Sequence, residues 1–278
     1  MFECKEKVAV CGHRGERVHG IENTIAAISY AADLGVDMIE TDVRMSKDGH
    51  LFLMHNLKLE DLTDGNGYVC DHTYKELRSM NAAVHGKSSD DFSAPQFEHV
   101  ALLDELLDVA VDYPDLMLNI ELKDLPVPGK EDFAFESASK AANMLALRGL
   151  GNRTWLNSFS GKIVERSFKD FGNTFHYHGF YPWNIMGEME VDPSEICDVV
   201  CLLNWIVQDD GIVVKHHTIP CPEAWYVLLL KKGIMPLTVS FYSDFQAYID
   251  AMAYGSRILM ADDPKAMLSR LRAMNLHN

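Results

Sequence analysis

Short runs of apolar or β-branched residues alternate with longer amphipathic stretches along the whole chain. Runs of about four to eight such residues are typical of buried strands, and apolar positions every three to four residues are typical of helices. The alternation therefore predicts repeated β–α units around a parallel sheet. The predicted strands cover residues 8–11, 38–43, 51–54, 117–121, 154–157, 174–177, 197–202, 235–239 and 257–260, and the predicted helices cover residues 23–34, 102–111, 131–147, 161–169, 221–232, 243–254 and 264–274.

Nine predicted strands compete for the eight places of a closed (β/α)8 barrel, which is the simplest packing of such units. The strands at 38–43 and 51–54 are joined only by residues 44–50, which contain an Asp48-Gly49 turn. That connection is too short for a helical crossover, so the two strands are expected to pair like a hairpin. One of them is then not a regular barrel strand.

Residues 57–100 break the β–α rhythm. Thr63-Asp64-Gly65 predicts a turn, and Thr73 followed by Glu76 predicts a capping box that opens a short helix. We therefore expect an α/β TIM (β/α)8 barrel in one domain, residues 1–278, with a small insertion subdomain at about 57–100 after the early strands. The polar segment 90–95 closes that insertion.

The composition and charge of the chain indicate which kinds of molecule it can bind. The chain has 278 residues and is 47% hydrophobic, which is enough to fill a sizeable core. It carries 25 Lys and Arg against 41 Asp and Glu, a formal charge of −16, which disfavours nucleic acid and anionic membrane surfaces. A small phosphate substrate is still compatible with this charge, because a few cations and a metal reverse the field inside a cleft.

The cysteines and the N-terminal sequence predict a location. Six cysteines are scattered without paired spacing, as reduced core thiols are. The first residues run directly into a predicted strand without the apolar stretch of a signal peptide, and no apolar run is long enough to span a bilayer. We expect a cytoplasmic protein without stable membrane insertion.

Two pairs of polar residues alternate along predicted strands. Glu40 and Asp42 are two residues apart, so both side chains lie on one face of their strand. Carboxylates that share a small volume need a cation, a metal or a retained proton, and hard oxygen ligands suit Mg²⁺ or Ca²⁺. Solvated acids on an edge strand explain the pair equally well when it is considered alone. Glu121 and Lys123 repeat the spacing and offer a third ligand and a phosphate cation, although a surface ion pair is the better explanation for these two in isolation.

Two histidines close predicted strands. His13 and His55 stand at strand ends, where the catalytic groups of barrels gather, and two imidazoles can supply the acid and the base for metal-assisted cleavage of a phosphodiester. Arg14 follows His13 and offers a planar donor for phosphate. Isolated histidines are more often surface or core residues, and we assign no role to the others. Asn23 or Thr24 is expected to cap a helix, and Glu22 to be a partner for a histidine.

The combined pattern resembles the glycerophosphodiester phosphodiesterases, which are TIM barrels with an insertion after the early strands. The resemblance implies that Glu40, Asp42 and Glu121 bind one divalent metal, Mg²⁺ or Ca²⁺. It also implies that His13 and His55 are the acid/base pair and that Arg14 and Lys123 contact the phosphate of a small-molecule phosphodiester. The matching segments are His13-Arg14-Gly15, Glu22-Asn23-Thr24, Ile39-Glu40-Thr41-Asp42-Val43, Asp48-Gly49, His55, Thr63-Asp64-Gly65, Glu76-Leu77, Ile120-Glu121-Leu122-Lys123, Ser158-Phe159 and Asp262-Asp263-Pro264.

The sequence departs from the family pattern at four places, and the first two departures remove no predicted catalytic group. Ile21 replaces a proline, and Asn56 replaces an aspartate after the second histidine. Because Asn56 carries no charge, the protonation of His55 is expected to differ from the family norm. The changes that affect the pocket for the alcohol are Leu237-Thr238-Val239-Ser240 and Ala261-Asp262-Asp263-Pro264.

The expected reaction is metal-dependent hydrolysis of glycerophosphodiesters to glycerol 3-phosphate and an alcohol. One alternative is a lysophospholipase D or phospholipase C-like phosphodiesterase on a lipid, for which Phe180, Trp183, Trp205, Phe241 and the insertion are candidates to line an apolar mouth. Another is a phosphodiester-binding sensor without turnover. The sequence leaves open which histidine is the acid, and whether water attacks directly or after a cyclic phosphate forms.

Overall fold

The computed structural model describes residues 4–85, 95–207, 213–215, 221–239 and 245–278. Several sequence predictions lie outside these residues. They are the segment 90–94 of the insertion, Ser240, Phe241 and the first two residues of the helix expected over 243–254. The side chain of Trp205 also lies outside the description.

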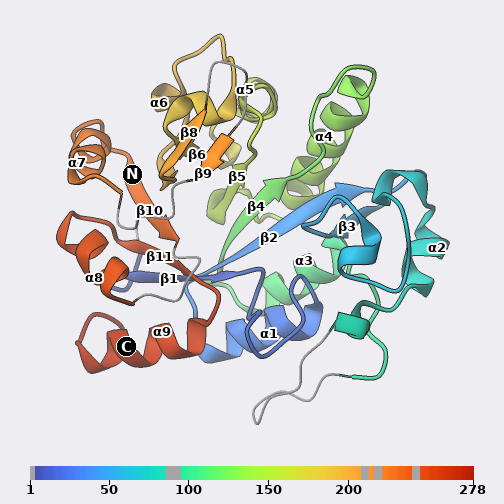
Figure 1. Ribbon diagram of the computed structural model, residues 1–278, viewed down its shortest axis with the longest axis horizontal. Coiled ribbons are helices and arrows are strands. Elements are labelled where there is room, and N and C mark those ends of the chain that lie inside the picture. The colour runs from blue at the N-terminus through green and yellow to red at the C-terminus, as the bar shows by residue number, and fades with distance from the viewer. Residues whose placement is uncertain (1–3, 86–94, 208–212, 216–220, 240–244) are drawn as a thin grey trace.

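Eight parallel strands form a closed barrel within the described residues (Figure 1). Their order is β1-β11-β10-β7-β6-β5-β4-β2, and β2 pairs back with β1. The predicted TIM barrel is therefore confirmed. The barrel strands are β1 (Ala9–His13), β2 (Met38–Met45), β4 (Met117–Leu122), β5 (Thr154–Asn157), β6 (His176–Tyr181), β7 (Val199–Leu202), β10 (Met235–Val239) and β11 (Ile258–Ala261).

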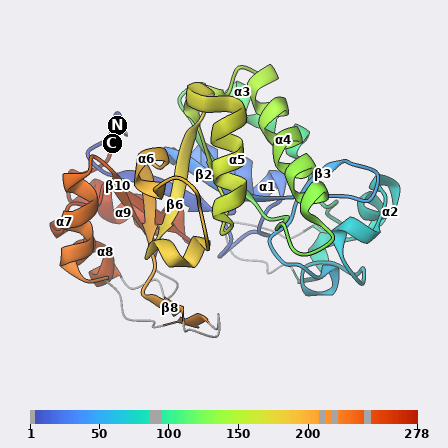
Figure 2. The same ribbon diagram turned by 90° about the horizontal axis from the view of Figure 1, so that it is seen from above.

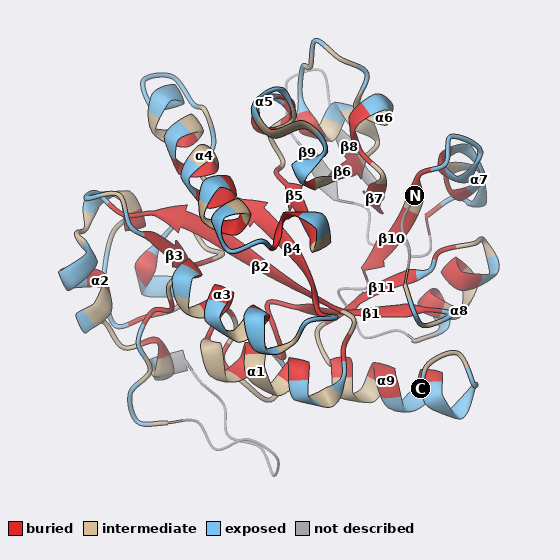
Figure 3. Cartoon of the chain, turned by 180° about the vertical axis from the view of Figure 1, so that it is seen from behind, coloured by how far each residue is buried: buried red, intermediate tan, exposed pale blue. Residues whose placement is uncertain are grey.

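Helices surround the barrel and turn their buried sides toward the strands (Figure 3). The first of them, α1, begins after Thr24, whose side chain accepts a hydrogen bond from the amide of Ala27, and it ends at Gly35 in a left-handed conformation. Thr24 is thus the predicted cap. The α-helices are α1 (Ile25–Leu34), α2 (Tyr74–Ser79), α3 (Leu103–Asp112), α4 (Glu131–Leu147), α5 (Gly161–Phe171), α6 (Pro193–Ile196), α7 (Glu223–Lys231), α8 (Phe245–Ala253) and α9 (Pro264–Ala273), and the 3-10 turns are η1 (Leu59–Asp61), η2 (Val69–Asp71), η3 (Ala82–His85), η4 (Gly151–Arg153), η5 (Gly172–Thr174) and η6 (Trp183–Met186).

The ninth predicted strand, β3 (Leu51–Leu53), pairs antiparallel with β2 outside the barrel, which confirms the expected hairpin. The insertion after it contains η1, η2, α2 and η3, and the predicted capping box of Thr73 and Glu76 opens α2. A small apolar cluster holds this region against β3; its buried members are Phe52, Met54, Leu59, Val69, Leu77 and Val100. The division into one domain with an insertion at about 57–100 stays a prediction.

Several elements differ from the prediction, among them the short helix α6, which was not predicted. A short antiparallel pair, β8 (Trp205–Val207) and β9 (Val213–Lys215), follows β7 and was not predicted. Strand β6 covers 176–181 rather than 174–177, because its sequence His-Tyr-His-Gly-Phe-Tyr is not a continuous apolar run. All six cysteines are free, as expected, and no described helix is long and apolar enough to cross a membrane.

The two ends of the described chain meet at the amino ends of the barrel strands. The amide of Val8 donates to the carbonyl of Leu276 at 3.2 Å, and the amide of Asn278 donates to Glu6 at 2.9 Å. Figure 2 shows both ends on the side of the molecule away from β8.

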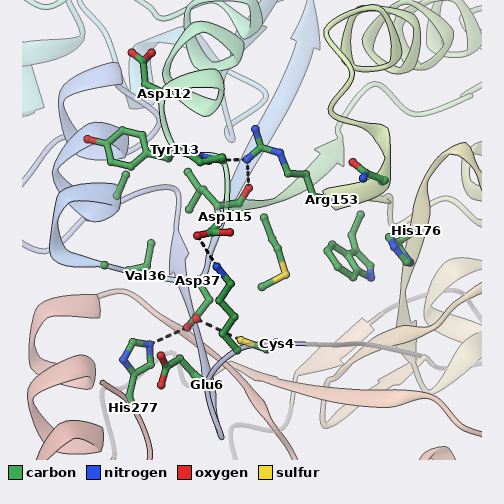
Figure 4. A pocket seen from close by; sticks show the side chains of 18 residues that line it. Cys4, Glu6, Val36, Asp37, Asp112, Tyr113, Asp115, Arg153, His176 and His277 are labelled. Atoms are coloured by element: carbon green, nitrogen blue, oxygen red, sulfur yellow. Dashed lines mark hydrogen bonds and ion pairs between the residues drawn. The ribbon is translucent and has the colours of Figure 1, made fainter.

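A cavity of about 690 Å³ opens at this amino end (Figure 4). Its polar groups are mostly engaged with one another: Lys5 pairs with Asp115 at 2.6 Å, and His277 pairs with Asp37 at 3.0 Å. Active sites of TIM barrels lie at the carboxyl end of the strands instead. A smaller cavity of about 200 Å³ lies at that end.

Candidate active site

Three buried carboxylates converge at the carboxyl end of the barrel. Glu40 and Asp42 lie on β2 and Glu121 on β4, and the parallel register places Asp42 directly opposite Glu121. One carboxylate oxygen from each residue lies within 4.8 Å of the other two. The structure thus brings together the three acids that the strand alternation selected, and we call them the carboxylate triad.

The charges of the triad are only partly compensated. The ammonium of Lys123 lies 2.6 Å from Oε1 of Glu121 and 3.2 Å from Oδ1 of Asp42, and Nε of Arg14 lies 3.4 Å from Oδ2 of Asp42. Burial raises the pKa of Glu40 well above its ordinary value, and the charge of Asp42 raises it further. Burial also raises the pKa of Glu121, although Lys123 opposes this. Burial alone would raise the pKa of Asp42, but the charges of Lys123 and Arg14 outweigh it and hold that pKa below its usual range.

These groups fit a hard divalent cation. Oδ1 of Asp42 is buried, has no hydrogen-bond partner among the described residues and lies 3.2 Å from the Lys123 ammonium. Three acids against two cations leave a net negative charge in a site screened from water. Carboxylate oxygens are the ligands that Mg²⁺ and Ca²⁺ prefer. The triad could therefore hold a metal of this class.

Asn23 orients one member of the triad. Its Nδ2 donates to Oδ2 of Asp42 at 2.9 Å, and its Oδ1 accepts from the hydroxyl of Thr41 at 2.6 Å. The residue adopts a left-handed backbone conformation with φ of 57°, which asparagine tolerates better than most residues. From the sequence, Asn23 was expected only as a possible helix cap. Since Thr24 is the cap, Asn23 is free to bind the aspartate.

The loop after β1 fixes Arg14 above the triad. The amide of Arg14 donates to Oε2 of Glu40 at 3.0 Å, and its guanidinium donates to Glu22 at 2.7 Å. Arg17 contacts the other oxygen of Glu22 at 2.9 Å. The expectation that Glu22 partners a histidine is wrong, because the two oxygens of its carboxylate pair with Arg14 and Arg17.

The imidazole of His13 is held between two acids. Its Nδ1 lies 2.6 Å from Oδ1 of Asp262, and its Nε2 lies 3.8 Å from Oε2 of Glu40. Burial lowers the pKa of His13, and the hydrogen bond to Asp262 opposes this shift. Asp262 directly follows β11, so its place after a predicted strand was the signal that could have identified it as a partner of His13.

The imidazole of His55 has an uncharged partner. Its Nδ1 lies 2.7 Å from Oδ1 of Asn56, whose Nδ2 donates to Asp61 at 3.1 Å. Because Asp61 can only accept, the Asn56 oxygen faces the histidine, which therefore carries its proton on Nδ1 and presents Nε2 as an acceptor. Burial lowers the pKa of His55 to about 4, and the attraction of Asp42 only partly offsets it.

Arg44 braces the strand ends that carry two of these groups. Its guanidinium donates to the carbonyl of Lys123 at 3.1 Å and to the carbonyl of His55 at 2.9 Å. The side chain thereby links the end of β4 to the residues after β3. Its place within β2 gave no signal of this role in the sequence.

Six of the seven predicted site residues line one cavity of about 200 Å³, and the seventh, Asp42, is buried behind them. Of the aromatics expected at an apolar mouth, Phe180 lines the cavity and stacks on Phe159 at 3.9 Å between ring centroids. Trp183 packs against Tyr181 and is not part of the lining. The described lining consists of His13, Arg14, Glu40, His55, Asn119, Glu121, Lys123, Asn157, Phe159, His178, Phe180, Cys201, Leu203, Val239 and Met260.

A second group of possible ligands lies nearby. Glu16, His19 and Asp263 also place oxygen or nitrogen atoms within 4.8 Å of one another. The carboxylate of Glu16 already accepts from the amides of His19 and Gly20, and Asp263 caps α9. Local hydrogen bonds account for these groups without a metal.

Comparison with known proteins identifies relatives of the chain. The model of the glycerophosphoryl diester phosphodiesterase family matches residues 13–167, more than half of the chain. A glycerophosphodiester phosphodiesterase from Caldanaerobacter subterraneus subsp. tengcongensis is 38% identical over 42% of this chain and 46% of its own length. One from Bacillus subtilis is 30% identical over 58% of this chain and 55% of its own length. The chain thus spans about half the length of the curated relatives it matches.

Solved structures share the fold. A glycerophosphodiester phosphodiesterase from Agrobacterium tumefaciens superimposes with a TM-score of 0.67 and 21% identity, covering 93% of this chain and 97% of the other. A phosphodiesterase from Oleispira antarctica, in complex with the product sn-glycerol-3-phosphate, gives a TM-score of 0.72 and 20% identity over 95% and 96% of the two chains. With the family match over its first half and the same barrel throughout, this chain belongs to the glycerophosphoryl diester phosphodiesterase family.

Proposed function

We propose that the protein catalyses metal-dependent hydrolysis of glycerophosphodiesters to glycerol 3-phosphate and an alcohol. The observation that carries the proposal is the convergence of two histidines, two cations and three carboxylates on one cavity at the carboxyl end of the barrel. Membership of the family and the glycerol 3-phosphate complex of the Oleispira relative support the same substrate class.

Glu40, Asp42 and Glu121 would hold one divalent cation, Mg²⁺ or Ca²⁺. When bound there, the cation supplies Lewis-acid polarisation of the phosphoryl group. Arg14 and Lys123 line the same cavity and neutralise the other phosphate oxygens as charge develops on them. Asn23 and Arg44 hold Asp42 and the backbone of Lys123 in place for this task.

The partners of the two histidines favour different roles. His55 presents an unprotonated Nε2 and has a pKa of about 4, so at neutral pH it can accept the proton of an attacking hydroxyl. His13 has carboxylates near both ring nitrogens, and the hydrogen bond to Asp262 opposes the lowering of its pKa by burial. We therefore assign the base to His55 and the acid that protonates the departing alcohol to His13.

Release of glycerol 3-phosphate from glycerophosphocholine and glycerophosphoethanolamine tests the proposal. We expect release that requires Mg²⁺ or Ca²⁺ and that falls by ~10²-fold or more in His13→Ala and in His55→Ala, because each change removes a proton-transfer group. The exposed His50 provides a matched control, and His50→Ala should retain wild-type rates.

The alternatives are separate outcomes of the same assay. The described residues enclose a cavity of about 200 Å³, which suits a small polar diester, so we expect lysolipids to be poorer substrates than the soluble diesters. Faster cleavage of lysolipids would favour the alternative of a lysophospholipase D or phospholipase C-like phosphodiesterase. Binding of glycerophosphocholine with metal but without product would identify a sensor and refute the proposed reaction.

A further inference from the structure

Three uncharged polar side chains line the cavity and take no part in the proposed chemistry. They are Asn119 on β4, Asn157 on β5 and His178 on β6, and each is about 1% exposed. Asn119 precedes Glu121 by two residues on the same face of β4, and the sheet register places Asn157 opposite both Glu121 and His178. We call these three residues the polar floor, because they form a layer that adjoins the carboxylate triad.

The contacts within the polar floor fix the orientation of its groups. Oδ1 of Asn119 accepts from Nδ2 of Asn157 at 2.8 Å and lies 3.0 Å from Nδ1 of His178. A carbonyl oxygen can only accept, so Nδ1 of His178 carries the ring proton and Nε2 is an acceptor. Burial lowers the pKa of His178 to about 3, so the ring is neutral at physiological pH.

Each residue of the polar floor has one buried atom without a hydrogen-bond partner among the described residues. These atoms are the Nδ2 donor of Asn119, the Oδ1 acceptor of Asn157 and the Nε2 acceptor of His178. Leaving such a group unpaired costs about 1–3 kcal/mol. A purely structural network would satisfy its members, as buried polar groups in native proteins almost always are. Three unpaired atoms beside one cavity therefore indicate a ligand with complementary groups.

We propose that the polar floor binds the hydroxyl groups of the substrate's glycerol moiety, a role that rests on the proposed function of the site. A hydroxyl both donates and accepts, which matches one free donor and two free acceptors. A phosphate oxyanion only accepts and would be repelled by the two acceptors, so it belongs with Arg14 and Lys123. The volume of about 200 Å³, below the roughly 300–1,000 Å³ of drug-sized pockets, suits a polyol phosphate.

The direct test compares two diesters that differ in hydroxyl groups. In His178→Leu we expect the KM for glycerophosphocholine to rise about three- to tenfold, the loss of one hydrogen bond, with kcat/KM for bis(4-nitrophenyl) phosphate unchanged. The matched control is His176→Leu, two residues earlier on β6, because His176 lines the cavity at the other end of the barrel. An equal loss on both diesters, or no loss on either, would overturn the proposal.

Two further variants guard against a folding defect. His178→Gln can return an amide oxygen to the position of Nε2 and should restore much of the affinity for glycerophosphocholine. Asn157→Leu removes the Oδ1 acceptor instead and should show the same selective rise in KM. Thermal unfolding of each variant establishes that the compared proteins are folded.

Calorimetry separates this proposal from the proposed reaction. With Mg²⁺ or Ca²⁺ present, the wild type should bind glycerol 3-phosphate more tightly than inorganic phosphate, and His178→Leu should abolish that difference without weakening phosphate. If the wild type shows this preference but cleaves no diester, the role of the polar floor is supported and the proposed reaction is refuted. If the wild type cleaves diesters but binds glycerol 3-phosphate and inorganic phosphate equally, the proposed reaction is supported. The proposed role of the polar floor is then refuted, and its unpaired atoms bind only water.

Discussion

Burial lowers the pKa of both His13 and His55, and the residue that faces Nδ1 differs between them. His13 faces the carboxylate of Asp262, and His55 faces the amide of Asn56. A carboxylate favours the charged imidazole, whereas an amide oxygen does so only weakly. The asymmetry is visible in the sequence only at Asn56, since Asp262 lies more than two hundred positions from the histidine it contacts.

Replacing Asn56 with aspartate tests this asymmetry. In Asn56→Asp a carboxylate would face Nδ1 of His55 and raise its pKa from about 4 toward the ordinary 6.5. Because the base acts in its neutral form, the acidic limb of the kcat/KM profile should move to higher pH by roughly one unit or more, with little change at pH 8. The profile is measured with glycerophosphocholine from pH 4.5 to 8.5.

The exposed Asn66 provides a control on the same insertion. Asn66→Asp adds the same charge away from His55 and should leave the profile as in the wild type. A limb that moves equally in both variants would mean that overall charge, and not the hydrogen bond to His55, sets the pH dependence.

Sequence patterns predicted some residues of the site and missed others for a physical reason. The two-residue spacing of Glu40 with Asp42 is a property of one strand, so it could be read from the chain. The bond from Asn23 to Asp42 depends on a left-handed turn and on the packing of a loop over a strand. Such contacts between elements leave no local spacing to detect.

Among the elements, the loop between β1 and α1 holds His13 and Arg14 within a narrow space. Gly15 has φ of 82°, and a Cβ built on it would lie 2.8 Å from the backbone carbon of Ala27. The amide of Glu16 donates to the carbonyl of Ala27 at 3.2 Å. The loop therefore rests directly on the first turn of the helix, and only glycine permits that approach.

A comparison of two glycines separates crowding from backbone strain. Gly15→Ala should destabilise the fold by about 2–4 kcal/mol, from the positive φ together with overpacking against α1, and should also lower kcat/KM by displacing His13. Gly129 has φ of 80° but nothing within 4 Å of its added Cβ, so Gly129→Ala should cost only about 1 kcal/mol. Urea unfolding and diester hydrolysis measure both effects. Equal destabilisation of the two variants would contradict close packing of the loop.

The strands show where element prediction works. Strands β4, β5 and β10 are predicted almost to the residue because apolar or β-branched residues fill most of their positions. Strand β6 was displaced because its interior positions carry His176, His178 and Phe180, which line the two cavities of the barrel. With two histidines and a glycine among its six residues, β6 lacks the apolar pattern by which strands are recognised.

At the scale of the whole molecule, metal binding should couple the active site to stability. A cation at the triad binds the folded chain and not the unfolded one, so at one hundred times its Kd it adds about 2.7 kcal/mol. We expect Mg²⁺ or Ca²⁺ to raise the thermal midpoint of the wild type by roughly 5 °C, and EDTA to reverse the rise. Differential scanning calorimetry measures the shift.

Two conservative variants identify the cluster responsible. Glu121→Gln removes one oxygen charge from the triad and should abolish most of the shift. Asp263→Asn alters the second cluster while keeping a good cap for α9, and should retain the shift. A shift lost in Asp263→Asn and retained in Glu121→Gln would place the metal at the wrong cluster for the proposed reaction.

The meeting of residues 6–8 with residues 275–278 at the amino end of the barrel has a practical consequence. A short linker could join the two ends, and the circular chain could be reopened in another exposed loop, as proteins with adjacent termini often tolerate. A bead or electrode coupled through these ends would hold the barrel at the amino ends of its strands, opposite the carboxylate triad. The mouth of the cavity that holds the carboxylate triad would then face the solution.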